Sequence, residues 1–192
     1  MIFLDVMLSP IFTLYTYFPV QFFVSLTLDL LLMTAGVVLS VVMYKKGSFN
    51  KFQLAACIVL SVWGALVLFL TVLGRRMNRG NINSFCNLDL FSCYRRSFFE
   101  GDRVLLKSTL QNIAMFIPFG FVLPAILNNK HRFIVTIIIS FTLSLFIETC
   151  QLLLKSGIFE LDDLINNTLG AFLGVILYCV YDKIISKLRK RG

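Results

Sequence analysis

The sequence predicts an all-α fold, a polytopic bundle of about five transmembrane helices. Hydrophobic residues fill 58% of the 192 positions and charged residues only 15%, which is well outside the composition of a soluble domain. The apolar residues gather in runs of roughly 20, the length that an α-helix needs to cross the bilayer core. We therefore expect residues 1–192 to form a single membrane domain.

Five apolar runs define the expected spans. They cover residues 20–44, 52–73, 108–127, 133–154 and 164–181. The first 19 residues are also apolar, but Pro10 and Pro19 interrupt them, and a proline inside a helix removes a backbone donor. We expect an interfacial or half-inserted segment there, with a sixth span as the alternative. Residues 74–107 form the one long extramembrane loop of this arrangement.

Membrane orientation accounts for part of the basic excess of the chain. There are 18 Lys and Arg against 10 Asp and Glu, and cytoplasmic loops accumulate basic residues. With the N-terminus outside, ten cations fall on three short inside segments and eight fall outside, seven of them in loop 74–107. We expect the N-terminus outside and the C-terminus in the cytoplasm, with the reverse orientation as the alternative. No nucleic-acid partner is needed, and one His with five scattered Cys predicts no metal site and no cofactor.

Ionisable and amide side chains inside the apolar runs mark the candidate site, because such groups are costly in hydrocarbon. Glu148 and Gln151 lie three residues apart in the fourth run, and Lys155 follows four later, so all three share one helix face. We expect the third, fourth and fifth spans to meet around a polar cluster. Its members are Asn112, Glu148, Gln151, Lys155, Asp163 and Asn167. For any one amide, helix packing is the competing interpretation.

Small residues and a proline shape the helices around this polar cluster. Gly170 and Gly174 form a GxxxG motif, which lets another helix approach closely. Pro118 in the third run leaves the carbonyl of Ala114 without its usual helical donor. That arrangement favours a kink or a local opening of the backbone.

Three stretches of sequence stand in a fixed order along the second half of the chain. They read QNIAMFIPFGFVL from Gln111, FIETCQLLL from Phe146 and FELDDLINNTLGAFLG from Phe159. In this combination the chain resembles the VanZ family of bacterial membrane proteins, over about residues 66–180. The family pattern falls on Asn112, Pro118, Phe119, Gly120, Glu148, Gln151, Asp162, Asp163, Asn167 and Gly170.

The chain departs from the family pattern at two positions. Gly157 stands where the family usually has a basic residue, typically Arg, and Glu160 stands where it usually has Asp. Lys155 is the candidate replacement for the missing cation. The resemblance implies a protein of the bacterial cell membrane, acting in the cell envelope. It also implies a link to antibiotic resistance, because VanZ-like proteins are associated with reduced susceptibility to glycopeptides, teicoplanin especially.

Loop 74–107 suggests the first functional hypothesis. Its arginines alternate with aromatic residues, a combination that suits lipid phosphates at the membrane interface. The arginines are Arg75, Arg76, Arg79, Arg95, Arg96 and Arg103. We expect binding of membrane lipids and of an anionic lipid-linked envelope precursor, or of an envelope protein that handles one; non-specific contact with lipid phosphates is the competing interpretation. Cys86 and Cys93 lie in the same loop, and the sequence leaves undecided whether they form a disulfide.

Two alternative functions use the buried carboxylates. An intramembrane enzyme acting on a lipid-linked substrate would use Glu148 as general acid or base with Asp162 or Asp163 as partner, because a low-dielectric site pushes the proton affinities of two carboxylates apart. A small proton-linked transporter would use the same Glu148, although five spans without visible repeats are few for a transporter fold. The residues alone leave open whether a reaction is catalysed.

Overall fold

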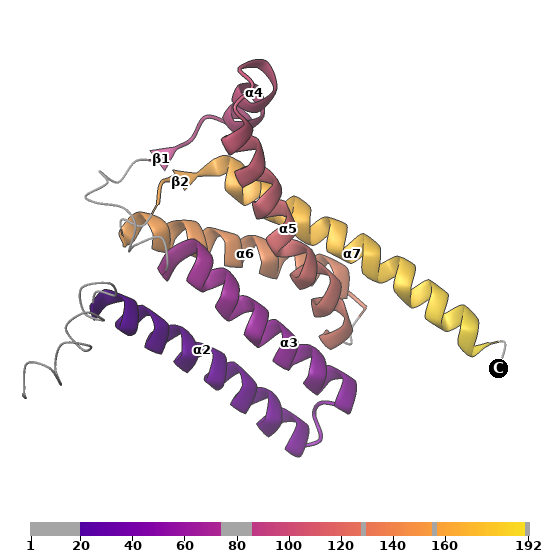
Figure 1. Cartoon of the computed structure of the whole chain (residues 1–192). Helices are drawn as coiled ribbons and strands as arrows, with labels where there is room; N and C mark the ends of the chain where they lie inside the picture. The colour runs from indigo at the N-terminus through magenta and orange to yellow at the C-terminus, as the bar shows by residue number, and fades with distance from the viewer. Residues whose placement is uncertain (1–19, 74–85, 128–129, 155–156, 191–192) are drawn as a thin grey trace, which may run out of the picture.

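The computed structural model describes residues 20–73, 86–127, 130–154 and 157–190 (Figure 1). Its elements are α2 (Val20–Lys45), α3 (Lys51–Leu68), the π-helical η1 (Phe69–Leu73), β1 (Cys86–Asn87), α4 (Ser92–Phe99), α5 (Arg103–Ile126), α6 (Arg132–Leu153), β2 (Phe159–Glu160) and α7 (Leu161–Arg189). Five of these helices, α2, α3, α5, α6 and α7, are long and apolar enough to cross a membrane. The predicted all-α membrane bundle with five spans is confirmed. The segment expected within residues 1–19 lies outside the described residues.

Helix α5 begins at Arg103, before the predicted start at residue 108. The reason is a local cap, in which Asp102 Oδ1 accepts hydrogen bonds from the backbone N–H groups of Val104 (3.1 Å) and Leu105 (3.0 Å). The last residues assigned to the loop from sequence are therefore the first turn of a membrane helix. This places the Arg103 side chain on α5.

Helix α7 is longer at both ends than the predicted span 164–181. It starts at Leu161 and continues to Arg189. Two carboxylates stand in its first turn and two basic residues in its last, so both ends suit the helix dipole. The charged turns lie outside the apolar run, which is why hydropathy alone did not include them.

Helices α5 and α7 form the closest helix pair of the bundle. A Cβ atom at Gly120 would lie 1.9 Å from the carbonyl oxygen of Ala171, and one at Gly170 would lie 2.1 Å from that of Ile113. At Gly174 the corresponding distance to the Ile117 oxygen is 2.2 Å. Only glycine permits this backbone contact, so the prediction that the GxxxG motif brings another helix close is confirmed. Helix α5 stays continuous through Pro118 and Pro124.

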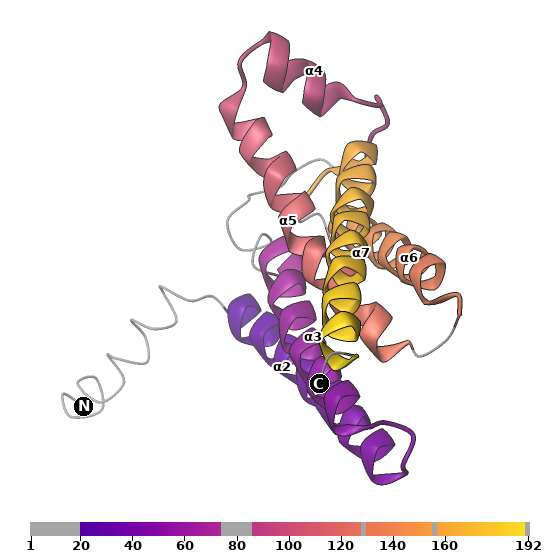
Figure 2. The same cartoon turned by 90° about the vertical axis from the view of Figure 1, so that its right-hand side faces the viewer.

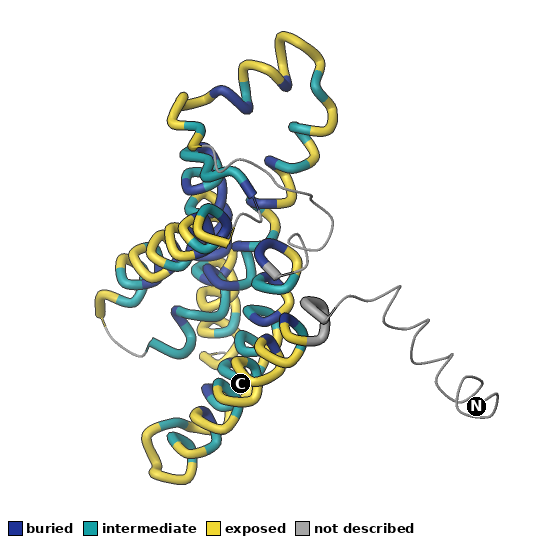
Figure 3. Tube along the Cα trace, turned by 90° about the vertical axis from the view of Figure 1, so that its left-hand side faces the viewer, coloured by how far each residue is buried: buried dark blue, intermediate teal, exposed yellow. Residues whose placement is uncertain are grey.

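The apolar core lies where α3 and η1 meet α5, α6 and α7. Its buried members are Val67, Val72, Phe116, Phe119, Ile147 and Ala171. Helix α2 packs mainly against α3 at the side of the bundle. Buried positions gather along the inner faces of the helices, and exposed positions follow their outer faces (Figure 3). Many of the exposed side chains are Leu, Ile, Val and Phe, as expected of a surface in contact with lipid.

The described part of loop 74–107 is folded, which the sequence did not predict. Strand β1 pairs in parallel with β2, with Cys86 opposite Phe159 and Asn87 opposite Glu160. Helix α4 lies beyond the ends of α5 and α7 (Figures 1 and 2). The loop after α3 and the connection between α6 and α7 therefore meet at one end of the bundle.

Helix α4 has small residues on its inner face and aromatic residues on its outer face. Ser92, Cys93 and Ser97 are buried, whereas Phe98 and Phe99 are 70% and 87% exposed. The reverse arrangement is usual for a helix in water. Phenylalanines beside arginines suit the boundary between head groups and acyl chains.

Candidate functional site

Asp162 holds the start of α4. Its fully buried carboxylate accepts hydrogen bonds from the backbone N–H of Phe91 (2.6 Å) and of Cys93 (2.8 Å) and from the hydroxyl of Ser92 (3.2 Å). Phe91 is the N-cap residue, has a left-handed conformation (φ 63°) and offers no side-chain cap of its own. A carboxylate from α7 thus caps α4, at the positive end of its dipole.

Asn166 extends this contact by one helical turn. Its Oδ1 accepts a hydrogen bond from the hydroxyl of Tyr94. Asp162 and Asn166 are four residues apart, so one face of α7 carries α4. Burial, and secondarily the charge of Asp162, raises the pKa of Tyr94, which keeps the phenol protonated as a donor.

Cys93 is a buried thiol beside several carboxylates. Its Sγ donates to Glu160 Oε2 at 3.8 Å. Burial raises its pKa to about 12, and the hydrogen bond with Asp162 and the charge of Glu160 act in the same direction. Cys86 and Cys93 are both free thiols, the first exposed and the second buried, so the disulfide left open by the sequence is not formed.

Glu148 and Gln151 are buried on the predicted face of α6. Glu148 is 1% exposed, and its Oε2 accepts a hydrogen bond from the backbone N–H of Glu160 at 3.1 Å. Gln151 donates through Nε2 to the carbonyl oxygen of Thr71 at 3.3 Å. Each side chain therefore joins α6 to another segment, β2 in the first case and η1 in the second.

Gly157 and Gln151 share one space. A Cβ atom at Gly157 would lie 2.8 Å from Oε1 of Gln151, so a larger side chain there would displace the end of the glutamine side chain. This is the position at which the VanZ pattern usually has a basic residue. Lys155, the expected replacement for that cation, lies outside the described residues.

Asn167 and Asp163, two further members of the predicted cluster, lie near the start of α7. Asn167 donates through Nδ2 to Ser144 Oγ at 2.8 Å, across the interface of α7 and α6. Asp163 lines a cavity of about 240 Å³ together with Asp102 and Glu160. Helices α5, α6 and α7 do meet as expected. Glu160 lies close to both Glu148 and Asp163, because its N–H donates to Glu148 and its side chain lines the cavity of Asp163.

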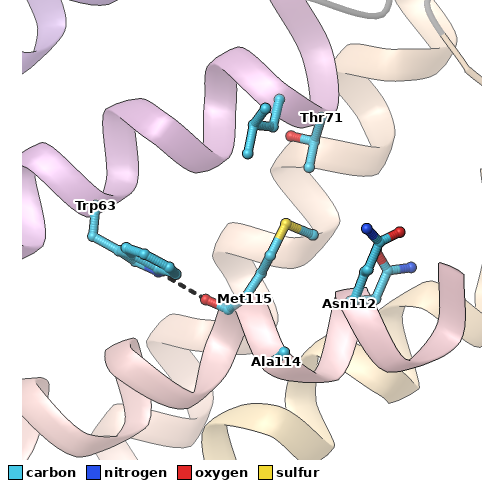
Figure 4. Close-up of a pocket in the computed structure, with 7 residues that line it drawn as sticks. Trp63, Thr71, Asn112, Ala114 and Met115 are labelled. Carbon is cyan, nitrogen blue, oxygen red and sulfur yellow. Dashed lines mark hydrogen bonds between the residues drawn. The ribbon is translucent and has the colours of Figure 1, made fainter. Parts of the chain in front are cut away.

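Asn112 lines a cavity of about 350 Å³ between α5 and the end of α3 (Figure 4). The residue is 5% exposed, and its Nδ2 has no hydrogen-bond partner among the described residues. Thr71 and Trp63 face the same cavity, and Trp63 donates to the Met115 carbonyl at 2.9 Å. A buried amide donor without a partner is unfavourable unless a ligand or water satisfies it.

A second and more open surface cavity, of about 530 Å³, continues along α5. It shares Gln111 and Ala114 with the first cavity and adds Arg103 and Lys107. Since Pro118 has no N–H, the carbonyl of Ala114 lacks its helical donor at this junction. We call the two cavities together the α5 groove. From one end of this groove to the other, the lining changes from Arg103 and Lys107 to the amides of Gln111 and Asn112, and then to Trp63.

The basic residues of loop 74–107 differ in whether a carboxylate pairs with them. Arg95 pairs with Asp89 at 2.6 Å, and Arg96 lies 3.4 Å from Asp102 and 3.8 Å from Glu100. The exposed Arg103 and Lys107 form no ion pair within the part of the chain that the structure describes. Arg75, Arg76 and Arg79 lie outside that part.

Sequence reasoning missed Thr71, Ser144 and Trp63 as members of these contacts. Each is a polar or amphipathic side chain inside an apolar run, and that is the signal by which they could have been noticed. Their partners lie far along the chain, 80 residues away in the case of Thr71 and Gln151. Lys107 was counted with the loop because the start of α5 was placed too late.

A family model described as VanZ/LLP1 matches residues 54–182. The chain belongs to the VanZ/LLP1 family. The match contains the region 66–180 predicted from motifs, runs from α3 into α7, and includes every residue of the α5 groove. No match was found among curated proteins or among solved structures.

Proposed function

We propose that this VanZ/LLP1 protein binds an anionic lipid-linked component of the bacterial cell envelope in the α5 groove. The observation that carries the proposal is the continuity of the groove, from Arg103 and Lys107 to Asn112, whose Nδ2 has no hydrogen-bond partner among the residues that the structure describes. A phosphate at the two cations and a hydrogen-bonding group at Asn112 match this order of side chains. Apolar neighbours such as Leu106 and Leu110 suit the lipid portion.

One of the candidate catalytic carboxylates has a structural contact. Asp162 accepts three hydrogen bonds from α4, which suits a structural cap better than proton transfer. Asp163 lines a different cavity from Asn112. Reduced susceptibility to glycopeptides such as teicoplanin would follow if the bound component, or its handling, limits access of the antibiotic to the envelope.

Trp63 offers a direct test, because it is the only tryptophan of the chain and lines the groove. The purified protein is titrated with a polyprenyl phosphate while tryptophan fluorescence is recorded, and a polyprenyl alcohol serves as the uncharged comparison. We expect saturable binding of the phosphate only. Replacing Arg103 and Lys107 together by Gln should weaken it by at least about 100-fold, since each charge-assisted hydrogen bond contributes about 1.5–3 kcal/mol.

The matched control is Lys187→Gln together with Arg189→Gln, which removes two cations at the other end of α7. It should leave the titration unchanged. Equal affinities of the Arg103/Lys107 variant and this control would contradict the proposal. In cells that depend on the protein for teicoplanin tolerance, the first variant should also become more susceptible and the control should not.

A further inference from the structure

One face of α7 points away from the bundle along the second half of the helix. Phe172, Ile176 and Val180 lie four residues apart, so they form one stripe on the helix surface. Their side chains are 51%, 43% and 51% exposed, whereas Val175 and Tyr178 on the other side of the helix are buried. This apolar stripe therefore contacts acyl chains when α7 crosses the membrane.

Two lysines continue the stripe beyond the apolar run of α7. Because the helix is continuous from Leu161 to Arg189, the spacing of residues fixes the direction in which each side chain leaves it. Lys183 and Lys187 follow Ile176 by seven and eleven residues, which places both within about 20° of Ile176 around the helix. Both lysines are exposed. We call Phe172, Ile176, Val180, Lys183 and Lys187 together the outer face of α7.

Among the residues that the structure describes, no carboxylate pairs with these two lysines. Asp182 directly precedes Lys183 but is directed toward α6, where it lies 3.2 Å from Arg132. Like charges four residues apart on one helix face destabilise the helix. An anion between the ammonium groups of Lys183 and Lys187 would remove that repulsion.

Aromatic rings mark the depth of the lysines in the membrane. The Phe121 ring lies 6.1 Å from that of Tyr178 and 5.7 Å from that of Tyr181, and tyrosines gather at the boundary between bilayer and water. Lys183 follows directly beyond these rings in α7. From Lys183 back to Phe172 the helix covers about 16 Å, which is roughly half of the bilayer core. The outer face of α7 therefore extends over one leaflet, from the head groups to the middle of the bilayer.

An open apolar cavity adjoins the inner end of this face. It has a volume of about 370 Å³, lies between α6 and α7, and includes Phe172 in its lining. Phe141 of α6 and Leu169 of α7 line it as well. The volume falls within the range of about 300–1,000 Å³ found for ligand sites. An acyl chain that passes Val180 and Ile176 would end there.

We infer that the outer face of α7 binds one anionic phospholipid, with the phosphate between Lys183 and Lys187 and one acyl chain along Ile176 to the cavity at Phe172. Charge and apolar surface lie in one line, in the order in which a phospholipid presents its head group and its tail. A second copy across a two-fold axis would bring its own lysines against these, so like-charge repulsion disfavours it. The inference holds for either orientation of the chain, and the site is separate from the α5 groove and its proposed function.

The test places a tryptophan on this face, as Ile176→Trp in a chain that also carries Trp63→Phe. The protein is reconstituted in vesicles of equal amounts of phosphatidylglycerol and phosphatidylcholine, and the acyl chains of one lipid or the other are brominated to quench tryptophan fluorescence. We expect stronger quenching by brominated phosphatidylglycerol, because each lysine near the head group should favour the anionic lipid about fivefold. Lys183→Gln with Lys187→Gln should bring quenching by the two lipids close to equal.

The matched control is Leu31→Trp in the same Trp63→Phe chain, because Leu31 is 65% exposed on α2. Both brominated lipids should quench it equally. Equal quenching at position 176 would overturn the inference, as would a phosphatidylglycerol preference that is the same at position 31 or survives replacement of both lysines. Shielding of position 176 from both lipids would show a protein contact on this face and would overturn it too.

Native mass spectrometry of the purified chain gives a second measurement, with Trp63 in place. One phosphatidylglycerol per chain should be retained from an equal mixture with phosphatidylcholine. Lys183→Gln with Lys187→Gln should lose it, and Lys45→Gln with Lys46→Gln, which removes two exposed cations at the end of α2, should keep it. Equal retention by these two variants would contradict the inference. Titration of Trp63 with polyprenyl phosphate should be unaffected by Lys183→Gln with Lys187→Gln, which separates this site from the proposed function.

Discussion

Two adjacent carboxylates at the head of α7 have different surroundings. Asp162 is enclosed by the first residues of α4, and Asp163 lines a cavity with Asp102 and Glu160. On a helix, neighbouring residues point about 100° apart, so two identical side chains meet different partners. The same division holds one turn later, where Asn166 contacts α4 and Asn167 contacts α6.

Asp162→Asn should loosen α4. The side-chain amide of the asparagine would direct its own N–H at one or more of the three groups that donate to Asp162. This removes part of the helix cap, which stabilises by about 1–2 kcal/mol. We expect Cys93, buried under α4, to react about tenfold faster with maleimide, because local opening governs its exposure. The rate is measured with Cys86→Ser as background, and Asp163→Asn is the matched control. Unchanged reactivity of Cys93 would show that the cap is not what holds α4.

The raised pKa of Cys93 predicts that the stability of the protein depends on pH. Its pKa is about 12 in the folded protein against an ordinary value of 9.0, so the folded state binds more protons than the unfolded state between these values. The contribution of this thiol to the free energy of unfolding is therefore fully present below about pH 9 and falls as the pH rises toward 12. Cys93→Ser should flatten this fall in unfolding experiments. A parent and variant with parallel profiles above pH 9 would contradict the assignment.

Asn112→Leu should separate stability from binding. Leucine has a similar size and removes a buried donor that lacks a partner, so the free energy of unfolding should stay equal or rise by about 1 kcal/mol. Binding of polyprenyl phosphate should weaken about tenfold. The control is Asn167→Leu, which breaks the hydrogen bond to Ser144 and should lower the melting temperature. Unchanged binding by Asn112→Leu would remove this amide from the site.

At the scale of elements, glycine contacts decide how closely α5 and α7 pack. Gly170→Ala would put a methyl group 2.1 Å from the Ile113 carbonyl oxygen and force the helices apart. We expect the free energy of unfolding to fall by about 1–3 kcal/mol, seen as a lower melting temperature in detergent. Gly64→Ala is the matched control, because its Cβ would lie 3.8 Å from the Phe119 ring, an ordinary contact. Equal effects of the two substitutions would contradict the packing argument.

The helices could be predicted from sequence because span length, GxxxG spacing and buried carboxylates are local features. The contacts of loop 74–107 could not. The bond from Phe91 to Asp162 joins residues 71 positions apart, and nothing in either segment specifies the other. Likewise, Asn112, Glu148, Gln151 and Asn167 of the predicted cluster are buried, but helix rotation and close packing, which the sequence does not specify, decide which partners each of them meets.

At the scale of the whole molecule, the orientation in the membrane can be tested with one thiol. Cys86 is exposed at the same end as α4, and Cys93 is buried, so an impermeant maleimide added to intact cells should report on Cys86. With the N-terminus outside, labelling should occur without permeabilisation and disappear in Cys86→Ser. Labelling that requires permeabilisation would place this end in the cytoplasm and reverse the orientation.

The attachment of α4 to α7 also bears on how the proposed ligand would reach the α5 groove. Because α4 is held by a buried carboxylate, it is poorly suited to swing away as a gate. The groove instead has open flanks at the side of the bundle, where Leu70 and Leu110 are 53% and 57% exposed. A lipid-linked ligand would therefore arrive sideways, by diffusion within the leaflet, and its local concentration in the bilayer rather than in water would set the rate of encounter.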